Sequence, residues 1–359
     1  MKTNHFCAAF LAVMLLAAGG ASQAWGASYK AIDLNPSGFS HSVAQGISGT
    51  QQVGCGGATG GNEHALLWSS SAASYVDLNP SGFEWSEAFG ISGTQQVGCG
   101  DSHALLWSGT AASYVDLNPN GFDTSIARGT SGTQQVGYGW GSATSSSIHA
   151  LFWSGSANSF IDLNPSGFSN SIAYGTNGTQ QVGEGWGSAT GNNQHALLWS
   201  GSVTGYTDLN PTGFTYSHAF GINGTQQVGR GDSHALLWSG TAASYVDLNP
   251  SGFTYSYAYG TNGTQQVGYG NGSATGGNYH ALLWSGTAAS YVDLHQFLPT
   301  GFANSYAHGI DSYGNIVGSA ADSSGNGHAI LWEPIPEPAT FLLLGLGGLA
   351  VMRKRRLVN

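Results

Sequence analysis

The sequence predicts an all-β fold built from seven copies of one four-stranded unit, and three observations carry this prediction. Only 7% of the 359 residues are charged and 57 are glycine, whereas about 25% of residues are charged in a typical soluble domain. The phrase His-Ala-x-x-Trp recurs seven times. Short runs rich in Val, Leu, Tyr and Trp alternate with Gly, Asn and Ser turns, a pattern typical of strands and hairpins and not of long surface helices.

Four landmarks recur in every copy of the unit. An Ala-x-Gly phrase and a Val-Gly phrase come first, followed by His-Ala-x-x-Trp and then by Asp-Leu. Six of the Asp-Leu phrases continue as Asn-Pro, and the seventh continues as His295-Gln296. The motif histidines are His64, His103, His149, His195, His234, His280 and His328. The motif aspartates are Asp33, Asp77, Asp116, Asp162, Asp208, Asp247 and Asp293.

Each unit is expected to contain four short strands. In the copy at 217–248, Asn223-Gly224 is a two-residue turn of the kind favoured in hairpins, and 239–243 forms a second turn. Four strands in about 40–45 residues is the size of a β-propeller blade. The strands expected in this copy are 217–222, 225–229, 234–238 and 244–248.

The two ends of the repeat region are offset by one strand. The chain enters the repeats on a fourth-strand sequence at 28–34 and leaves on a third-strand sequence at 328–332. Pairing these two segments would close a seven-bladed β-propeller and remove the exposed sheet edges. The first strands, with their small Ala-x-Gly residues, would then line the axis. An open β-solenoid is the alternative, and it would not need this offset.

Residues 1–24 are predicted to be a signal peptide. Lys2 gives a positive start, an apolar run follows at 6–18, and Ser22-Gln23-Ala24 is a suitable cleavage site. The propeller is expected to occupy 25–333. Between residues 25 and 336 there are 17 acidic and three basic residues, a net charge of −14. This charge argues against nucleic acid as a partner and disfavours anionic polymers.

The C-terminus at 334–359 combines three features. The tripeptide Pro336-Glu337-Pro338 precedes an apolar stretch, Ala339 to Met352, which is short for an ordinary spanning helix of about 17–25 residues. A basic cluster follows at Arg353, Lys354, Arg355 and Arg356. This order resembles the PEP-CTERM sorting signal of Gram-negative bacteria.

The PEP-CTERM resemblance implies export across the inner membrane and recognition by an exosortase, a processing enzyme in the membrane. It also implies a final place in the cell envelope, at the cell surface or in the extracellular matrix, in bacteria that tend to export polysaccharide. The apolar stretch is expected to form a short transmembrane helix. Cleavage after recognition and retention as a simple tail anchor both remain open.

The repeat units resemble the HAF family of extracellular repeats, which is named for a His-Ala-Phe phrase followed by Trp. Here the Phe position is Leu in six copies and Ile330 in the last. The resemblance spans about 28–332 and implies a surface or secreted location, with no established chemistry.

The motif residues are expected to be structural. One histidine per blade cannot gather on one metal ion, so we expect each histidine to bond an aspartate of the same blade, and the motif tryptophans to pack between blades. Asp116 to Gly121 resembles the opening of a calcium loop, but Thr124 and Ala127 stand where further ligands belong. A turn capped by Asp and Asn is the alternative.

Candidate ligand-binding residues lie in the second strand and in the loop that follows it. Trp140 and Trp186 begin inserts rich in Gly and Ser, and Tyr138 and Tyr269 follow Val-Gly. Aromatic rings beside small polar groups suit sugar stacking, so the loop face is a candidate carbohydrate-binding surface. The alternative is that both tryptophans fold back onto the ring.

The residue after Val-Gly also predicts contacts between neighbouring blades. Cys55 and Cys99 occupy this position in adjacent copies, and Glu184 and Arg230 do so in another adjacent pair. In an exported chain disulfides persist, so a Cys55–Cys99 bond is expected, with two free thiols as the alternative.

No catalytic set is visible, and no cofactor or metal is expected. Polar residues that break the repeat are few: Glu84, Glu87, Asp123, Arg128, Arg230, His295 and His308. The sequence therefore indicates an exported, non-enzymatic repeat protein of the cell surface or matrix that acts as a structural or interaction scaffold. Carbohydrate binding through the loop face is the alternative, with exopolysaccharide or another surface protein as partner. A polysaccharide hydrolase or lyase is a third.

Overall fold

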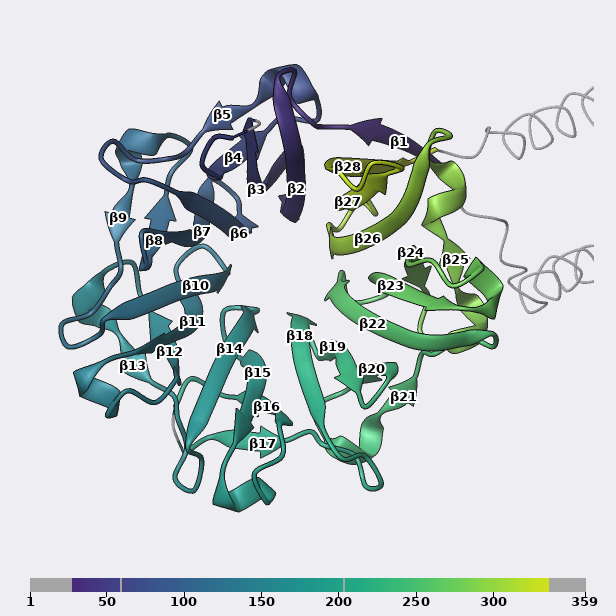
Figure 1. Cartoon of the computed structure of the whole chain (residues 1–359). Helices are drawn as coiled ribbons and strands as arrows, with labels where there is room; N and C mark the ends of the chain where they lie inside the picture. Colours follow the sequence, from purple (N-terminus) through teal and green to yellow (C-terminus); the bar gives the residue numbers. More distant parts are fainter. Residues whose placement is uncertain (1–27, 59, 203, 336–359) are drawn as a thin grey trace, which may run out of the picture.

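The structure is a computed structural model that describes residues 28–58, 60–202 and 204–335. Seven four-stranded antiparallel sheets surround a central axis as the blades of a propeller (Figure 1). The N-terminal strand β1 (Tyr29–Asp33) pairs with β28 (Gly327–Pro334) at the outer edge of the last blade, with Ala31 opposite Trp332. The predicted seven-bladed fold and its closure by the N-terminal strand are confirmed.

Within each blade the strands follow one another outward from the axis (Figure 1). The first strands are β2 (Phe39–Ser48), β6 (Ser86–Ser92), β10 (Thr124–Thr130), β14 (Asn170–Thr176), β18 (Ser217–Asn223), β22 (Phe253–Thr261) and β26 (Phe302–Ile310). The second strands are β3 (Gln51–Ala58), β7 (Gln95–Gly100), β11 (Gln135–Trp140), β15 (Gln181–Trp186), β19 (Gln226–Gly231), β23 (Gln266–Gly272) and β27 (Ile316–Asp322). The third strands are β4 (His64–Trp68), β8 (His103–Trp107), β12 (His149–Trp153), β16 (His195–Trp199), β20 (His234–Trp238), β24 (His280–Trp284) and β28.

The fourth strands are shorter than the sequence predicts. They are β5 (Val76–Asp77), β9 (Val115–Asp116), β13 (Ile161–Asp162), β17 (Tyr206–Asp208), β21 (Val246–Asp247), β25 (Val292–Asp293) and β1. In the fifth blade a 3₁₀ turn replaces the expected strand start, because Ser244 bonds back to Thr241.

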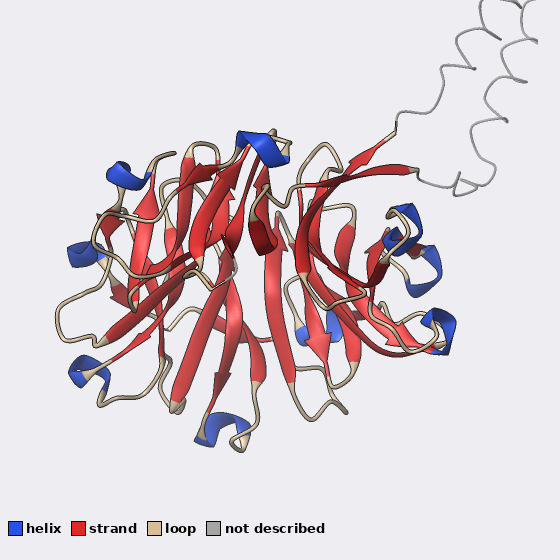
Figure 2. Ribbon diagram, turned by 45° about the horizontal axis from the view of Figure 1, so that its top comes forward, coloured by secondary structure: helices blue, strands red, loops and turns tan. Residues whose placement is uncertain are grey.

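Short 3₁₀ turns complete the blades and lie around the outside of the ring (Figure 2). Those before the fourth strands are η1 (Ala72–Ser74), η2 (Ala111–Ser113), η4 (Ala157–Ser159), η6 (Ala242–Ser244) and η8 (Ala288–Ser290). Those in the loops between second and third strands are η3 (Ser142–Thr144), η5 (Ser188–Thr190) and η7 (Ser273–Thr275), and η9 (Leu294–Phe297) follows β25.

The core lies between the blades. All seven motif tryptophans are fully buried, and each packs against the preceding blade, as Trp199 of β16 does against Val136 and Phe152. Each blade therefore buries its apolar face only by stacking on a neighbour, which favours a closed ring. The predicted packing of the tryptophans between blades is confirmed.

Glycine allows the closest backbone approaches. A Cβ on Gly183, the glycine of Val-Gly in β15, would lie 1.9 Å from the carbonyl oxygen of Ile172 in β14. At the axis, a Cβ on Gly221 would lie 2.4 Å from the carbonyl oxygen of Tyr259 in the next blade. The repeated glycines are therefore fixed by contacts within blades and between them.

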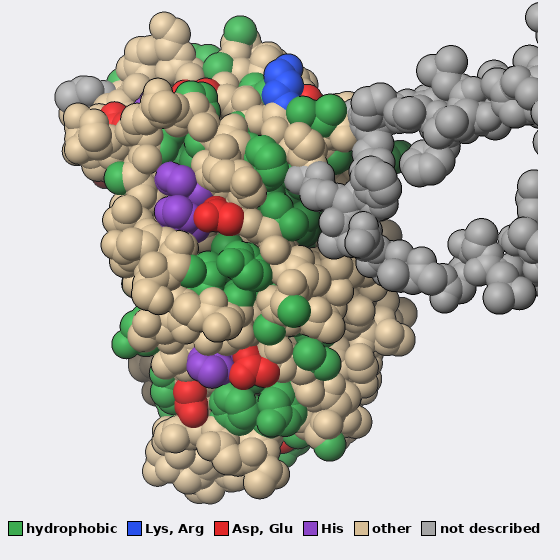
Figure 3. All heavy atoms as spheres, turned by 90° about the vertical axis from the view of Figure 1, so that its right-hand side faces the viewer, with side chains coloured by type: hydrophobic (Ala, Val, Ile, Leu, Met, Phe, Trp, Pro, Cys, Tyr) green, Lys and Arg blue, Asp and Glu red, His purple; other side chains and the backbone are tan. Residues whose placement is uncertain are grey.

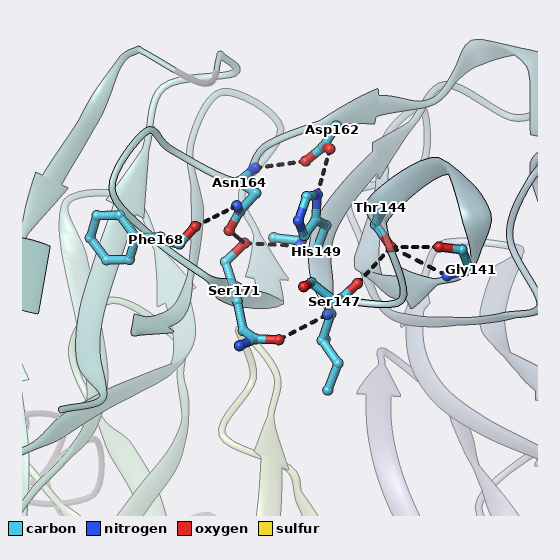
Figure 4. A network of polar contacts seen from close by, with 11 residues as sticks. Gly141, Thr144, Ser147, His149, Asp162, Asn164, Phe168 and Ser171 are labelled. Carbon is cyan, nitrogen blue, oxygen red and sulfur yellow. Dashed lines mark hydrogen bonds and ion pairs between the residues drawn. The ribbon is translucent and has the colours of Figure 1, made fainter. Parts of the chain in front are cut away.

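A repeated network of hydrogen bonds, here called the latch, joins neighbouring blades (Figure 4). His149 Nδ1 lies 2.6 Å from Asp162, whose other carboxylate oxygen accepts from the backbone N–H of Asn164. Ser171, in the next blade, donates to Asn164 and accepts from the backbone N–H of Ala150. The latch therefore connects the third strand of one blade to the first strand of the next.

The latch explains why the motif residues repeat. All seven motif histidines contact the aspartate of the same blade at 2.6–2.8 Å, as predicted. Where the sequence departs from Asn-Pro, the ring of His295 takes the place of the Asn amide and contacts Ser305 at 2.9 Å. The turn capped by Asp and Asn, weighed against a calcium loop, is the arrangement observed.

The predicted signal peptide at 1–24 and the apolar stretch at 339–352 lie outside the described residues. Within 28–335, apart from 59 and 203, no helix is long and apolar enough to cross a membrane.

Candidate functional site

The residue between Ala and Gly of the Ala-x-Gly phrase faces the axis in every blade. Ala and Gly do not vary at this place, whereas the residue between them takes five different identities. Together these side chains line a cavity of about 340 Å³, here called the axial channel. The lining residues are Gln45, Phe89, Arg128, Tyr174, Phe220, Tyr259 and His308.

The channel narrows toward the face that carries the hairpin turns. The next two residues of each first strand, a glycine followed by Ile or Thr, surround a smaller cavity of about 180 Å³. Because first strands start at the opposite face, the wider cavity lies toward the loops between second and third strands. This loop face is the side from which a ligand reaches the wider cavity.

Arg128 supplies the positive charge of the axial channel. Its guanidinium carbon lies 4.1 Å from the centroid of the Phe89 ring, a cation–π contact, and its Nη2 donates a long hydrogen bond of 3.4 Å to Tyr138. Among the described residues no carboxylate comes within ion-pair distance of it, and its Nε has no acceptor. Arg128 thus presents several unsatisfied donors.

A second polar group lies beside the channel lining and spans two blades. His218 of β18 contacts the buried carboxylate of Glu184 through Nδ1, and its Nε2 lies 3.2 Å from Arg230. Arginine can only donate, so Nε2 accepts and the proton resides on Nδ1. Burial, followed by the charge of Arg230, lowers the pKa of His218 to about 4. The expected pairing of Glu184 with Arg230 is therefore corrected: the imidazole of His218 separates them.

Tyrosines of the next blade lie on the far side of Arg230 from His218. Tyr257 receives a hydrogen bond from Arg230 at 2.9 Å, and the hydroxyls of Tyr259 and Tyr269 lie 3.4 Å apart. Burial raises the pKa of Tyr269 and of Tyr259, so both phenols stay protonated. Tyr269, a predicted ligand-binding residue, is thus a partly exposed member of this group of tyrosines.

The two candidate tryptophans end the second strands of neighbouring blades at the loop face. Trp140 and Trp186 are both partly exposed, so neither side chain is buried in the core and neither is fully exposed to solvent. Trp140 stacks on Tyr138 with ring centroids 6.4 Å apart. Since Tyr138 also contacts Arg128, a continuous line of side chains runs from the loop face into the axial channel.

Both tryptophans are held by the same loop geometry. The backbone carbonyl of Trp140 accepts from Asp123, and Thr144 bonds to Gly141 and to the carbonyl of Ser147 at 2.6 Å (Figure 4). The equivalent bonds recur around Trp186 through Thr190. The inserts are therefore ordered, and they fix two aromatic rings at equivalent positions in adjacent blades.

Cys55 and Cys99 are free, buried thiols, so the expected disulfide is not formed in the structure. Glu87 of β6 stands directly opposite Cys99, as His218 stands opposite Arg230, and the charge of Glu87 acts on both thiols. Burial raises the pKa of Cys99 to about 12 and that of Cys55 well above its usual value.

The remaining acidic residues serve the fold or stay isolated. Asp101 and Asp232 accept backbone hydrogen bonds in the second and fifth blades, where Asp-Ser replaces the insert. Burial, followed by the neighbouring charge of Glu63, raises the pKa of Glu87. The part of the chain described here holds no cluster of three or more groups suited to a metal ion. On the outer surface, histidines lie next to acidic side chains in a largely uncharged surround (Figure 3).

Sequence reasoning identified Arg128, Arg230, Glu87 and His308 as departures from the repeat but did not bring them together. It missed His218 and the channel residues Tyr174, Phe220 and Tyr259, which are common residue types in this chain. The signal was present as variability: in a repeat this regular, the residue between Ala and Gly changes from blade to blade.

Comparison with known proteins places the chain by its C-terminus and its fold. Residues 334–356 match the PEP-CTERM protein-sorting motif, which confirms the resemblance noted in the sequence. This motif marks exported proteins of Gram-negative bacteria and is recognised by an exosortase in the membrane. Among curated proteins no match was found.

Three solved structures share the propeller. A Mycobacterium tuberculosis puromycin-hydrolyzing peptidase is 10% identical, with a TM-score of 0.56 over 83% of this chain and 52% of its own. A puromycin hydrolase S511A mutant is 11% identical, with a TM-score of 0.52 over 80% and 53%. The extracellular domain of a proposed one-component system from B. thetaiotaomicron is 9% identical, with a TM-score of 0.51 over 84% and 39%.

The chain therefore spans about half the length, or less, of the solved structures it matches. At these identities the likeness shows the fold alone. The chain is thus a seven-bladed β-propeller that carries a PEP-CTERM sorting motif.

Proposed function

We propose that this protein is a non-enzymatic binding scaffold of the cell surface or extracellular matrix, and that its ligand is a carbohydrate held at the loop face. The observation that carries the proposal is the equivalent placement of Trp140 and Trp186 in adjacent blades. Two partly exposed indole rings on ordered loops offer flat apolar surfaces to sugar rings. Export by a sorting signal common in polysaccharide-exporting bacteria supports the same ligand class.

The chemistry of the histidines supports a role without catalysis. The motif histidines and aspartates bond each other and hold the latch, and each motif histidine stands in the same setting. His218, which breaks the repeat, has both ring nitrogens engaged by Glu184 and Arg230. An imidazole held on both sides has no free nitrogen with which to accept a proton from a substrate.

A polysaccharide hydrolase or lyase is the rival reading. The likeness to puromycin-hydrolyzing peptidases does not favour it, because the match is at 10–11% identity and covers about half of those chains. Incubation of the folded protein with extracted matrix polysaccharide, followed by chromatography of the products, separates the two. Polysaccharide chains of unchanged length would agree with a non-enzymatic scaffold. Shortened polysaccharide chains would show that the protein is an enzyme.

A glycan array with matched variants tests the proposed ligand class. Trp140→Ala and Trp186→Ala should each weaken binding by roughly tenfold or more, as is usual for aromatic anchors that the bound partner covers. Asn271 occupies the equivalent position in the sixth blade, before the same Gly-Ser-Ala-Thr loop, so Asn271→Ala is the matched control. Absence of binding by the parent protein, or equal binding by all variants, would refute carbohydrate recognition at this face.

A further inference from the structure

We propose that the axial channel binds the carboxylate of a single acidic sugar unit, of the uronate class, through Arg128. This proposal rests on the proposed function only in that a sugar, and no other molecule, carries the carboxylate. Three sets of observations carry it: the distribution of positive charge, the unsatisfied donors of Arg128, and the size and lining of the cavity.

Positive charge in the folded region is concentrated at the channel. Residues 25–336 contain only three basic side chains, Lys30, Arg128 and Arg230. Arg128 lines the axial channel, whereas Arg230 bonds to His218 and Tyr257, whose rings stack on the lining residues Phe220 and Tyr259. An acidic protein that places one of its three cations in a cavity and a second just behind the lining creates a local site for an anion, although its surface repels anionic polymers at a distance.

Arg128 is free to bind whereas Arg230 is not. Arg230 bonds to Tyr257 through Nη1 at 2.9 Å and to His218 through Nη2 at 3.2 Å, so both terminal nitrogens are engaged and only its buried Nε lacks an acceptor. Arg128 makes one long hydrogen bond, to Tyr138, and stacks on Phe89. A guanidinium that is stacked on one face keeps its edges available, and those edges match a carboxylate in bidentate geometry.

The cavity fits one sugar unit. Its volume of about 340 Å³ is at the small end of the roughly 300–1,000 Å³ typical of small-molecule sites. Phe220, Tyr174 and Tyr259 supply aromatic walls, and Gln45 supplies an amide. His308 Nδ1 donates to the carbonyl of Ala44 at 2.9 Å, so its Nε2 is an acceptor for a sugar hydroxyl.

The channel is continuous with the proposed loop-face site. Arg128 contacts Tyr138, and Tyr138 stacks on Trp140 at the loop face. A glycan stacked on Trp140 could therefore place an acidic terminal unit in the channel. Two carboxylates lie near the channel: Glu184, which His218 and Tyr174 engage, and Glu87, which is close enough to Arg128 for their charges to interact.

Isothermal titration of the folded protein with glucuronate, galacturonate, glucose, galactose, acetate and inorganic phosphate tests the proposal. A uronate should bind at least tenfold more tightly than its neutral hexose, and acetate alone should bind more weakly than the uronate. Arg128→Gln should weaken uronate binding at least tenfold. Lys30→Gln removes the same charge from the exposed edge strand β1 and should leave binding unchanged.

Glu87→Gln gives a change of opposite sign. Removing this carboxylate should strengthen uronate binding, which no loss of folding could produce. Equal binding of uronate and hexose, or unchanged binding by Arg128→Gln, would overturn the inference while leaving loop-face recognition intact. Binding of acetate or inorganic phosphate as tight as that of uronate would show a simple anion site. Failure to bind any sugar or polysaccharide would remove both proposals.

Discussion

His218 illustrates how single residues that break the repeat acquire unusual chemistry. Its imidazole lies between a carboxylate and a guanidinium, and it stays neutral because burial, followed by the charge of Arg230, lowers its pKa. The unfolded chain binds a proton on this residue below its ordinary pKa of 6.5, whereas the folded chain binds one only near pH 4. Folding therefore favours the neutral form of His218.

The pH dependence of stability follows from this pKa. Stability should be full above about pH 6.5 and should fall as the pH drops toward 4, by up to about 3 kcal/mol from this residue. His218→Gln, which cannot titrate, should show a flatter profile over this window when unfolding by urea is followed at several pH values. Parallel profiles for the two proteins would contradict the neutral, buried imidazole.

The cysteines give a second prediction at the residue scale. Because their pKa values are raised by burial, Cys55 and Cys99 should resist iodoacetamide at pH 8 in the folded protein. Both should be labelled after unfolding in urea without reductant, as measured by mass spectrometry. Two unlabelled cysteines in the unfolded chain would instead show the disulfide that the sequence suggested.

At the scale of elements, the latch sets how blades join. Ser171→Ala removes the acceptor of the buried Ala150 N–H and a donor to Asn164, and should cost about 1–3 kcal/mol in the free energy of unfolding. Ser169→Ala is the matched control, because this serine is exposed and its change should be nearly neutral. Equal urea midpoints for the two variants would argue against the latch.

Elements also show where sequence reasoning succeeds. The third strand 234–238 was predicted to the residue, because His-Ala-x-x-Trp combines a polar start with an apolar run. The fourth strand was predicted too long, since Ser244 can fold the backbone into a 3₁₀ turn that a strand pattern does not reveal. The His–Asp contacts followed from strand ends alone, whereas the position of Glu87 opposite Cys99 required the register of the first and second strands.

At the scale of the whole molecule, β1 closes the ring. A chain that begins at Asn35 lacks β1, leaves β28 as an open edge and removes the partner of His328. It should melt at a lower temperature than a chain beginning at Ser28 and should self-associate through the open edge. Light scattering and thermal unfolding check this; identical behaviour of the two chains would show that closure adds nothing.

The ring also explains why the fold was predictable and the site was not. Seven near-identical copies with a one-strand offset leave few alternatives to closure. The channel gathers one variable residue from each of seven blades, such as Arg128 and His308, which lie far apart in the chain. These residues come together only because seven blades surround one axis, and the sequence of a single repeat unit does not contain that arrangement. Function in a propeller of this kind therefore resides where the repeat is least regular.

Carbohydrate binding without cleavage at the loop face can be followed in a single NMR titration. Oligosaccharides from the matrix polysaccharide are added to ¹⁵N-labelled protein, and the indole N–H signals of Trp140 and Trp186 are followed. If the loop face binds carbohydrate, these two signals shift, those of the seven buried motif tryptophans stay in place, and the oligosaccharides keep their length. Unmoved signals from Trp140 and Trp186, or shortened oligosaccharides, would contradict binding without cleavage.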